Sequence, residues 1–238
     1  MSDGIISEEL WAQFAEQRLE EGNLNDHLDL PTIFRILGDA GGGAALDLGC
    51  GLGQSSFKLA EMLNYSVVAV DGSSEMLDRA RNLYSGSRIT WLESTFENLS
   101  FNDQSFDLIV SCLSFHFVCD LQPLIRNCAS WLKRGGLLVF SVRHPIRTCN
   151  PVGELTTDQE FGWSVNEYAN EGLRTFKWLG LDCVNFHRTV STYIRFLRNA
   201  GLRLEALEEP ISADETRSFA AESRSVPFFL TIAARKID

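Results

Sequence analysis

Closely spaced glycines and two aspartates form the pattern in this sequence that most suggests ligand chemistry. Residues 47–53 read DLGCGLG, and Asp71 closes the next apolar segment. Glycines in such a turn let the backbone approach a ligand closely. A carboxylate at Asp71 can accept hydrogen bonds from both hydroxyls of a ribose. The spacing therefore predicts a binding site for a cofactor that contains a nucleoside.

The glycine spacing also distinguishes between two kinds of cofactor. A dinucleotide fold has the pattern G-x-G-x-x-G, which seats a pyrophosphate at a helix N-terminus. Counted from Gly49 and Gly51, the third glycine of that pattern would fall at Gln54, but it falls at Gly53. The acidic residue before the glycines, Asp47, suits an amino-acid tail better than a phosphate. These features argue against a nicotinamide cofactor.

Histidines are the second group of residues that could take part in a reaction, because imidazole exchanges protons near neutral pH. The sequence contains four of them, at His27, His116, His144 and His187. His116 and His144 each follow a predicted strand, and His187 precedes a predicted helix, so all three are expected beside one cleft. We predict a catalytic base among these three, with a structural role as the alternative for each. His27 is expected to be structural or part of a lid.

Aromatic residues gather where regular periodicity is lost, between Pro145 and about Asn185. A long irregular segment in a compact domain is usually functional or disordered, and its aromatic content argues against disorder. We therefore predict a lid over the substrate, although the aromatic rings could simply pack this segment onto the core. The predicted lid residues are Trp11, Phe14, Tyr168, Trp178 and Arg143. Arg143 and Arg147 could bind an acidic acceptor or remain solvated.

The elements that would position these residues follow an alternating pattern. Strands are expected at residues 44–48, 66–70, 88–92, 106–112, 137–142, 202–207 and 227–233. The first five are apolar and are separated by amphipathic helices, as in a parallel sheet covered on both faces. The last two are expected to pair as a hairpin. The glycine turn and Asp71 then lie at the carboxyl ends of strands, where open α/β sheets bind ligands.

Bulk properties narrow the possible partners. The chain has 238 residues and a formal net charge of −11, which suits one α/β domain and argues against binding to nucleic acid or to an anionic membrane. Its six cysteines include no CxxC pair, so no metal site is predicted. No signal peptide and no apolar run long enough to span a membrane is found, so a cytoplasmic location is expected. The expected assembly is a monomer or a homodimer.

Several motifs resemble those of class I S-adenosylmethionine-dependent methyltransferases. ALDLGCGLGQSS is similar to the first motif of that family, and VVAVDGSSEMLDRAR to the segment that follows it. FENLSFNDQSFDLIVSCLSFHFVCD resembles the stretch around the fourth strand, and LKRGGLLVFSVRHP the fifth strand. The C-terminal part resembles a bacterial small-molecule branch of the type 11 kind. The resemblance implies a Rossmann-like, doubly wound, mostly parallel seven-stranded sheet with helices on both faces and an aromatic lid insertion.

The resemblance also implies which residues bind the cofactor. Backbone at Gly49 and Gly51 would hold the methionine end, and Asp71 would bind the ribose. Thr95 stands where relatives often carry an aspartate that accepts from the adenine amino group. The full set implied is Asp47, Gly49, Cys50, Gly51, Gly53, Asp71, Gly72, Met76, Thr95, Phe96, Glu97, Ser111 and Cys112.

The expected activity is transfer of a methyl group from S-adenosylmethionine, with S-adenosylhomocysteine as product, to an oxygen or nitrogen of a small molecule. The segment after the fourth strand lacks the Asn-Pro-Pro-Tyr-like tetrapeptide often found in relatives that methylate DNA or protein nitrogens. Alternatives are a non-methylating reaction such as cyclisation, or a non-catalytic cofactor-binding protein. The expected organisation is one domain, with N-terminal helices or lid (1–40), a cofactor-binding core (41–144), a substrate lid (145–188) and a C-terminal helix with closing strands (189–238).

Overall fold

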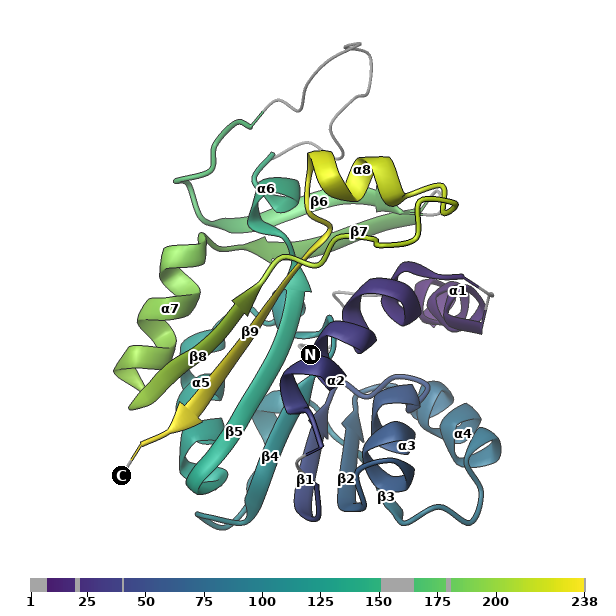
Figure 1. The fold of residues 1–238 in the computed structure, drawn as a ribbon, viewed down its shortest axis with the longest axis vertical. Coiled ribbons are helices and arrows are strands. Elements are labelled where there is room, and N and C mark those ends of the chain that lie inside the picture. The colour runs from purple at the N-terminus through teal and green to yellow at the C-terminus, as the bar shows by residue number, and fades with distance from the viewer. Residues whose placement is uncertain (1–7, 20–21, 40, 151–164, 179–180, 238) are drawn as a thin grey trace.

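The computed structural model describes residues 8–19, 22–39, 41–150, 165–178 and 181–237. The large sheet contains β1 (Gly43–Leu48), β2 (Tyr65–Asp71), β3 (Ile89–Glu93), β4 (Phe106–Ser111), β5 (Leu132–Arg143), β8 (Leu202–Glu208) and β9 (Phe229–Lys236). Their order is β3-β2-β1-β4-β5-β9-β8 (Figure 1). Neighbours from β3 to β5 pair in parallel, whereas β9 is antiparallel to β5 and β8. The predicted mostly parallel, seven-stranded sheet is confirmed.

Helices connect the strands and precede the first of them. They are α1 (Glu8–Leu19), α2 (Leu30–Leu37), α3 (Gln54–Glu61), α4 (Ser74–Leu83), α5 (Leu121–Trp131), α6 (Pro145–Thr148), α7 (Val190–Asn199) and α8 (Ala220–Ser225). A π-helical turn, η1 (Asn25–Asp29), precedes α2, and short 3-10 turns are η2 (Phe96–Asn98) and η3 (Phe115–Phe117). Ser73 caps α4 by accepting a hydrogen bond from the Met76 backbone N–H at 3.3 Å.

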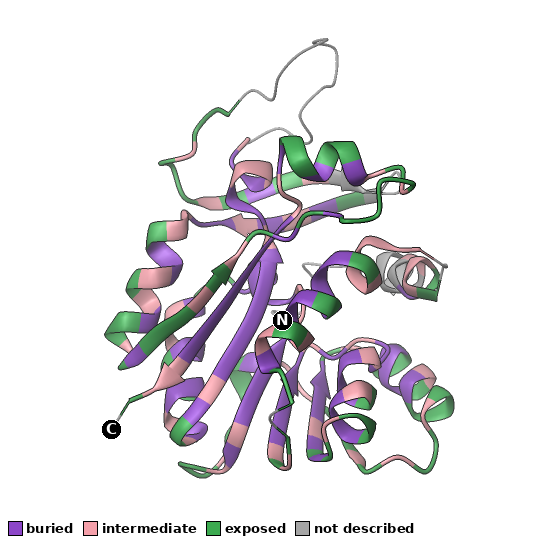
Figure 2. Cartoon of the chain, in the orientation of Figure 1, coloured by how far each residue is buried: buried purple, intermediate pink, exposed green. Residues whose placement is uncertain are grey.

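The core has two layers because successive side chains of a strand point to opposite faces of the sheet. Leu46 and Leu48 of β1 pack in a cluster with α5 and α7, whereas Ala45 packs with α2 and α3. Buried residues follow the central strands and exposed residues the outer faces of the helices (Figure 2). Asp47 shares the face of Ala45, so its carboxylate points toward α3 rather than into the α5 layer.

A separate two-stranded antiparallel sheet caps one end of the fold. Its strands are β6 (Gly172–Trp178) and β7 (Leu181–His187), which lie with α8 beyond the end toward which β5 runs (Figure 1). The prediction of an irregular segment up to about Asn185 is therefore wrong for residues 172–178 and 181–185. The alternation of residue types is obscured because Arg174 and Asn185 are polar yet buried in this hairpin.

The chain also differs from expectation where α5 meets β5. The sequence pattern places the end of the helix at Gly135 and Gly136, but α5 ends at Trp131 and both glycines lie within β5. The register between β4 and β5 shifts at this point, and Gly135 has a φ of +74°. No helix among the described residues is long and apolar enough to cross a membrane.

Candidate functional site

A cavity of 460 Å³ lies at the carboxyl ends of the parallel strands. This volume is within the range of roughly 300–1,000 Å³ that is usual for small-ligand sites. Eight of the residues predicted from the sequence line it: Gly49, Cys50, Gly51, Asp71, Met76, Cys112, His116 and Arg143. Residues 17–18, 22–25 and 29–30, in the region predicted as N-terminal helices or lid, form another wall, although none of these residues was predicted individually.

The glycine turn forms the wall of the cavity next to β1 and β2, and its N–H groups are used within the protein. Gly49 and Cys50 both donate to the carbonyl of Val70, at 2.8 and 2.9 Å, and Gly51 donates to Asp71 at 2.8 Å. A phosphate-binding loop needs such N–H groups for its ligand. Gly51 has a φ of +53°, and no atom lies within 4 Å of the position that a Cβ would take. The turn therefore offers a ligand an open backbone face rather than a ring of N–H donors.

Asp71 is the acid at the end of β2, and it holds the glycine turn in place. Its Oδ2 accepts from the Gly51 N–H at 2.8 Å, and its Oδ1 accepts from the Ser73 N–H at 2.9 Å. The side chain is only 2% exposed, and this burial raises the pKa of the carboxyl despite the backbone donors. A carboxylate has about four lone-pair positions, so each oxygen can still accept from a ligand hydroxyl.

Asp47 lies behind the glycine turn and does not line the cavity. Its Oδ2 accepts from the hydroxyls of Ser55 and Ser56 on α3, at 2.5 and 2.6 Å. Its Oδ1 is buried and has no hydrogen-bond partner among the described residues. Burial raises the pKa of this carboxyl to about 6.

Asp29 is a second buried carboxylate, and it lines the cavity. It is the last residue of the π-helical turn η1, and its Oδ2 accepts from the Ser141 hydroxyl of β5 at 2.9 Å. Its Oδ1 has no partner within the described part of the chain, and burial raises the pKa of the carboxyl to about 7. π-Helical turns are frequent at functional sites, and an acid this costly to bury suggests a role other than stability.

The burial of Asp29 predicts a pH-dependent stability difference. Because its pKa is about 3.8 when unfolded and about 7 when folded, the unfolded chain releases this proton first as the pH rises. Stability therefore falls between about pH 4 and about pH 7, by up to roughly 4 kcal/mol, and is flat above. Asp29→Asn removes this titration while Ser141 can still donate to the new amide oxygen.

We expect urea unfolding without ligand to show that Asp29→Asn gains clearly more stability over wild type at pH 8 than at pH 5, where only about a third of the effect is present. Asp47 also has a raised pKa and changes the stability in the same direction, but it is present in both proteins, so its effect cancels when the variant is compared with wild type. Asp78→Asn is the matched control, since that side chain is 71% exposed on α4. Equal effects of Asp29→Asn at both pH values would contradict the assignment.

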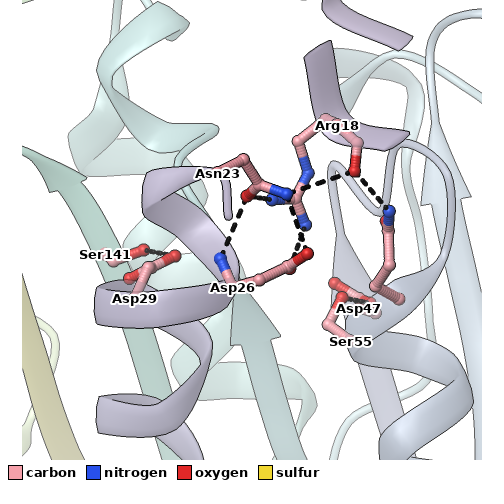
Figure 3. Close-up of polar contacts among 8 residues, drawn as sticks. Arg18, Asn23, Asp26, Asp29, Asp47, Ser55 and Ser141 are labelled. Carbon is pink, nitrogen blue, oxygen red and sulfur yellow. Dashed lines mark hydrogen bonds and ion pairs between the residues drawn. The ribbon is translucent and has the colours of Figure 1, made fainter. Parts of the chain in front are cut away.

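Arg18 joins the end of α1 to both the turn before α2 and the start of α3 (Figure 3). Its guanidinium donates to Asn23 Oδ1 at 2.8 Å and lies 3.4 Å from Asp26. Its backbone carbonyl accepts from the side-chain amides of Asn23 and Gln54, at 3.3 and 3.5 Å. These contacts place a cation at the cavity wall beside the glycine turn and hold the N-terminal segment over it.

Of the three histidines predicted as bases, His116 alone lines the cavity. It lies in η3 after β4, is 3% exposed, and its Nδ1 has no hydrogen-bond partner among the described residues. Burial lowers the pKa of this imidazole well below its usual value, and the positive charges of Arg143 and Arg188 lower it further. His116 is therefore a neutral imidazole at physiological pH.

The other two histidines bind protein atoms away from the cavity wall. His144 caps α6 by accepting from the Ile146 N–H at 3.2 Å, and its Nε2 lies 2.9 Å from Glu209. His187 donates from Nε2 to the Tyr168 carbonyl at 2.9 Å, which leaves Nδ1 to accept from Thr148 at 2.8 Å. Both imidazoles have a lowered pKa, chiefly because of burial.

Arginines and phenylalanines form the part of the cavity wall next to β5, β6 and β9. The Arg143 guanidinium lies 4.1 Å from the ring centre of Phe176, and that of Arg147 lies 3.7 Å from the ring centre of Phe228. All four side chains belong to residues that line the cavity, as does Phe229. Among the described residues of 145–188, Phe176 and Arg147 contribute to the wall.

The remaining predicted residues do not line the cavity or have side chains outside the described part of the structure. Those that do not line the cavity are Asp47, Gly53, Gly72, Thr95, Phe96, Glu97, Ser111, Tyr168, His144 and His187. Phe96 packs edge-on against Phe115 at 6.2 Å between ring centres, and the Ser111 hydroxyl bonds to Ser114 at 2.5 Å. The side chains of Trp11, Phe14 and Trp178 fall outside the described part of the structure.

Several residues of the cavity were not predicted from the sequence, namely Arg18, Asn23, Asp29, Phe176 and Phe228. Asp29 carried a usable signal, because an acid between two leucines in an apolar run before a helix is a candidate buried charge. Among the described residues, no group of three metal-ligating side chains converges on one point.

The comparisons with known proteins agree with one another on methyltransferases. A family model described as a methyltransferase domain matches residues 46–140. An uncharacterized protein of Haemophilus influenzae is 32% identical over 230 residues, which cover 91% of this chain and 90% of that protein. A malonyl-[acyl-carrier protein] O-methyltransferase of Coxiella burnetii is 26% identical over 76% of this chain and 62% of its own. The crystal structure of an S-adenosylmethionine dependent methyltransferase from Mesorhizobium loti has a TM-score of 0.79 at 34% identity, and the match covers 86% of this chain and 96% of that one.

Proposed function

The chain belongs to the class I S-adenosylmethionine-dependent methyltransferases, and we propose that it methylates an oxygen or nitrogen atom of a small molecule. Its cofactor is S-adenosylmethionine, which supplies a methyl group already activated on a sulfonium. The observation that carries the proposal is that one cavity is lined by the glycine turn, Asp71 and a neutral His116, whose Nδ1 has no hydrogen-bond partner among the described residues. This arrangement supports a cofactor site with a proton acceptor in the same cavity.

The charges around Cys112 fit a cationic cofactor. Asp29 and Asp47 each have a buried Oδ1 without a described partner, and both raise the pKa of the Cys112 thiol, after the larger effect of burial. An unbalanced buried carboxylate is stabilised by a cation. In our proposal, Asp29 at the cavity wall stabilises the ammonium and sulfonium groups, Asp47 adds negative charge from behind the glycine turn, and Arg18 binds the carboxylate of the methionine end. Asp71 accepts the ribose hydroxyls, and Met76 packs on the adenine.

His116 is the proposed base for the acceptor. Methyl transfer is an in-line displacement, so orientation supplies much of the rate, and a base is needed only when the acceptor must lose a proton. Because His116 is neutral, Nδ1 can accept that proton. The acidic chain and the enclosed cavity support a small acceptor rather than a nucleic acid.

Label transfer from methyl-labelled S-adenosylmethionine tests the proposed function. The protein is incubated with a low-molecular-mass cell extract, and the label is followed into small molecules and into macromolecules. We expect a small molecule heavier by one methyl group, together with S-adenosylhomocysteine. Label only in macromolecules would contradict the proposal, and a converted small molecule with intact cofactor would indicate cyclisation or a related reaction.

Replacing Asp71 with alanine is expected to weaken binding of both S-adenosylmethionine and S-adenosylhomocysteine. The loss of hydrogen bonds from the ribose to a charged acceptor should cost about 1–3 kcal/mol, or about 5- to 150-fold in Kd. Calorimetry measures this directly without an acceptor. Asp78→Ala is the control, because that exposed carboxylate of α4 lies outside the cavity wall. Unchanged affinity in folded Asp71→Ala protein would remove Asp71 from the cofactor site.

A further inference from the structure

Two arginines stand beside the cavity where β5 ends. Arg143 is the last residue of β5 and Arg147 lies in α6 shortly after it, whereas Asp71 is the last residue of β2. The strand order places β2 and β1 on one side of β4 and β5 on the other. Arg143 and Arg147 therefore bring positive charge to the β5 side of the cavity, where the buried Asp29 bonds to Ser141, although the chain as a whole has a net charge of −11. Walls of low dielectric concentrate such a local field.

The aromatic rings on this side of the cavity are already paired with cations. Arg143 lies over Phe176 at 4.1 Å, and Arg147 lies over Phe228 at 3.7 Å. A cationic acceptor that approached these rings would be repelled by the two guanidinium groups, so cation–π attraction to the rings would not favour its binding. An anionic acceptor would meet the Arg143 guanidinium and an apolar surface.

Arg147 is held by neighbouring protein groups. It donates to the carbonyls of Pro227 and Val226, at 3.0 and 2.8 Å, and pairs with Glu222 at 2.9 Å. It therefore links the segment before β9 to α6. Arg143 lines the cavity with His116, and its charge lowers the pKa of that imidazole after the larger effect of burial.

We propose that the methyl acceptor is a small apolar carboxylate, with its anionic group bound by Arg143 and its apolar body against Phe176, Phe228 and Phe229. Guanidinium and carboxylate groups match in charge and in their paired hydrogen-bond geometry. The anionic end then lies at the β5 side, and the nucleophilic atom points back toward His116 and Cys112. This inference rests on the proposed function and adds the substrate class.

Binding of matched probes to the protein saturated with S-adenosylhomocysteine tests the substrate class. The probes are the carboxylates cinnamate and 4-hydroxybenzoate, their neutral amides, and the amine counterparts cinnamylamine and 4-hydroxybenzylamine. We expect calorimetry to detect the carboxylates and to show binding at least about tenfold weaker for amides and amines, as for loss of a charge-assisted hydrogen bond.

Variants identify the residue responsible. Arg143→Gln should weaken carboxylate binding by about 10- to 100-fold, whereas Arg143→Lys should keep part of it because the charge remains. Arg203→Gln is the matched control, since that arginine is 63% exposed on β8 and pairs with Glu205. Thermal unfolding checks that each variant is folded.

Two results would overturn the inference. One is tighter binding of amides or amines than of carboxylates, or no carboxylate binding, by protein that binds S-adenosylhomocysteine. The other is carboxylate affinity that is the same in wild type and Arg143→Gln. A protein that binds no S-adenosylhomocysteine would instead fail the proposed function, so the two failures are distinguishable.

Discussion

Gly49→Ala is expected to lower the free energy of unfolding by about 2–5 kcal/mol and to abolish measurable cofactor binding. The φ of Gly49 is +75°, and a Cβ built there would lie 2.4 Å from the Cβ of Ser114 and 2.6 Å from its hydroxyl. An L-residue in this conformation costs roughly 1–2 kcal/mol by itself. The steric overlap adds to that cost, because Ser114 cannot move without losing hydrogen bonds.

Ser114 is fixed from two directions. Its hydroxyl donates to the Leu48 carbonyl at 2.9 Å and contacts the Ser111 hydroxyl at 2.5 Å, and its side chain is buried. Any shift of Ser114 therefore disturbs the ends of both β1 and β4, which border the cavity. Displacement of the Gly49 backbone would instead move the turn that Asp71 holds.

Gly51→Ala is the matched control for this substitution. Gly51 also has a positive φ, +53°, but no atom lies within 4 Å of its built Cβ. Only the backbone cost of roughly 1–2 kcal/mol is expected. Urea unfolding of both variants, without ligand, measures the difference. Equal destabilisation by the two alanines would show that the contact with Ser114 does not matter.

The sheet and the glycine turn could be predicted because their signals are local. Short apolar segments ending in Asp47–Leu48 and Asp71 alternate with amphipathic helices, and a parallel sheet is the arrangement that buries such strands. The turn itself required glycine at positions with positive φ, such as Gly49 and Gly53. The spacing of residues in the sequence was therefore enough to predict the side of the cavity next to β1 and β2.

The opposite side of the cavity depends on contacts between distant parts of the chain. Asp29 meets Ser141 across 112 positions of sequence, and Arg147 meets Glu222 across 75. No periodicity within one element encodes such pairs. The β6–β7 hairpin escaped prediction for a related reason, since its buried Arg174 bonds to the Cys149 carbonyl at 3.1 Å and so interrupts the apolar pattern.

Tertiary contacts also separate histidines that look equivalent in the sequence. His116 and His144 both follow strands, but η3 directs His116 to the cavity while α6 uses His144 as its cap. A capping histidine contributes mainly to stability, because both of its nitrogens already have partners. The difference between the two is a property of the turn that follows each strand.

His116→Asn is expected to lower kcat by about 10²- to 10⁴-fold for an acceptor that must lose a proton. Binding of S-adenosylhomocysteine should stay within about threefold, because the proposed role of His116 concerns the acceptor. Since burial and Arg143 hold the His116 pKa well below its usual value, the imidazole is already neutral at pH 7. Turnover should therefore be level above neutral pH and fall only as the pH drops through the lowered pKa.

The same substitution at His144 or His187 separates a catalytic from a structural role. His144→Asn and His187→Asn break hydrogen bonds to Glu209 and to the Tyr168 carbonyl, so thermal stability should fall first. The rate per folded molecule then distinguishes a catalytic from a structural histidine, and kcat is measured well below the unfolding temperature of each variant. If His144→Asn lost turnover at unchanged stability while His116→Asn kept it, the base would be His144. A loss confined to His116→Asn would assign the proton acceptor to the one predicted histidine that lines the cavity.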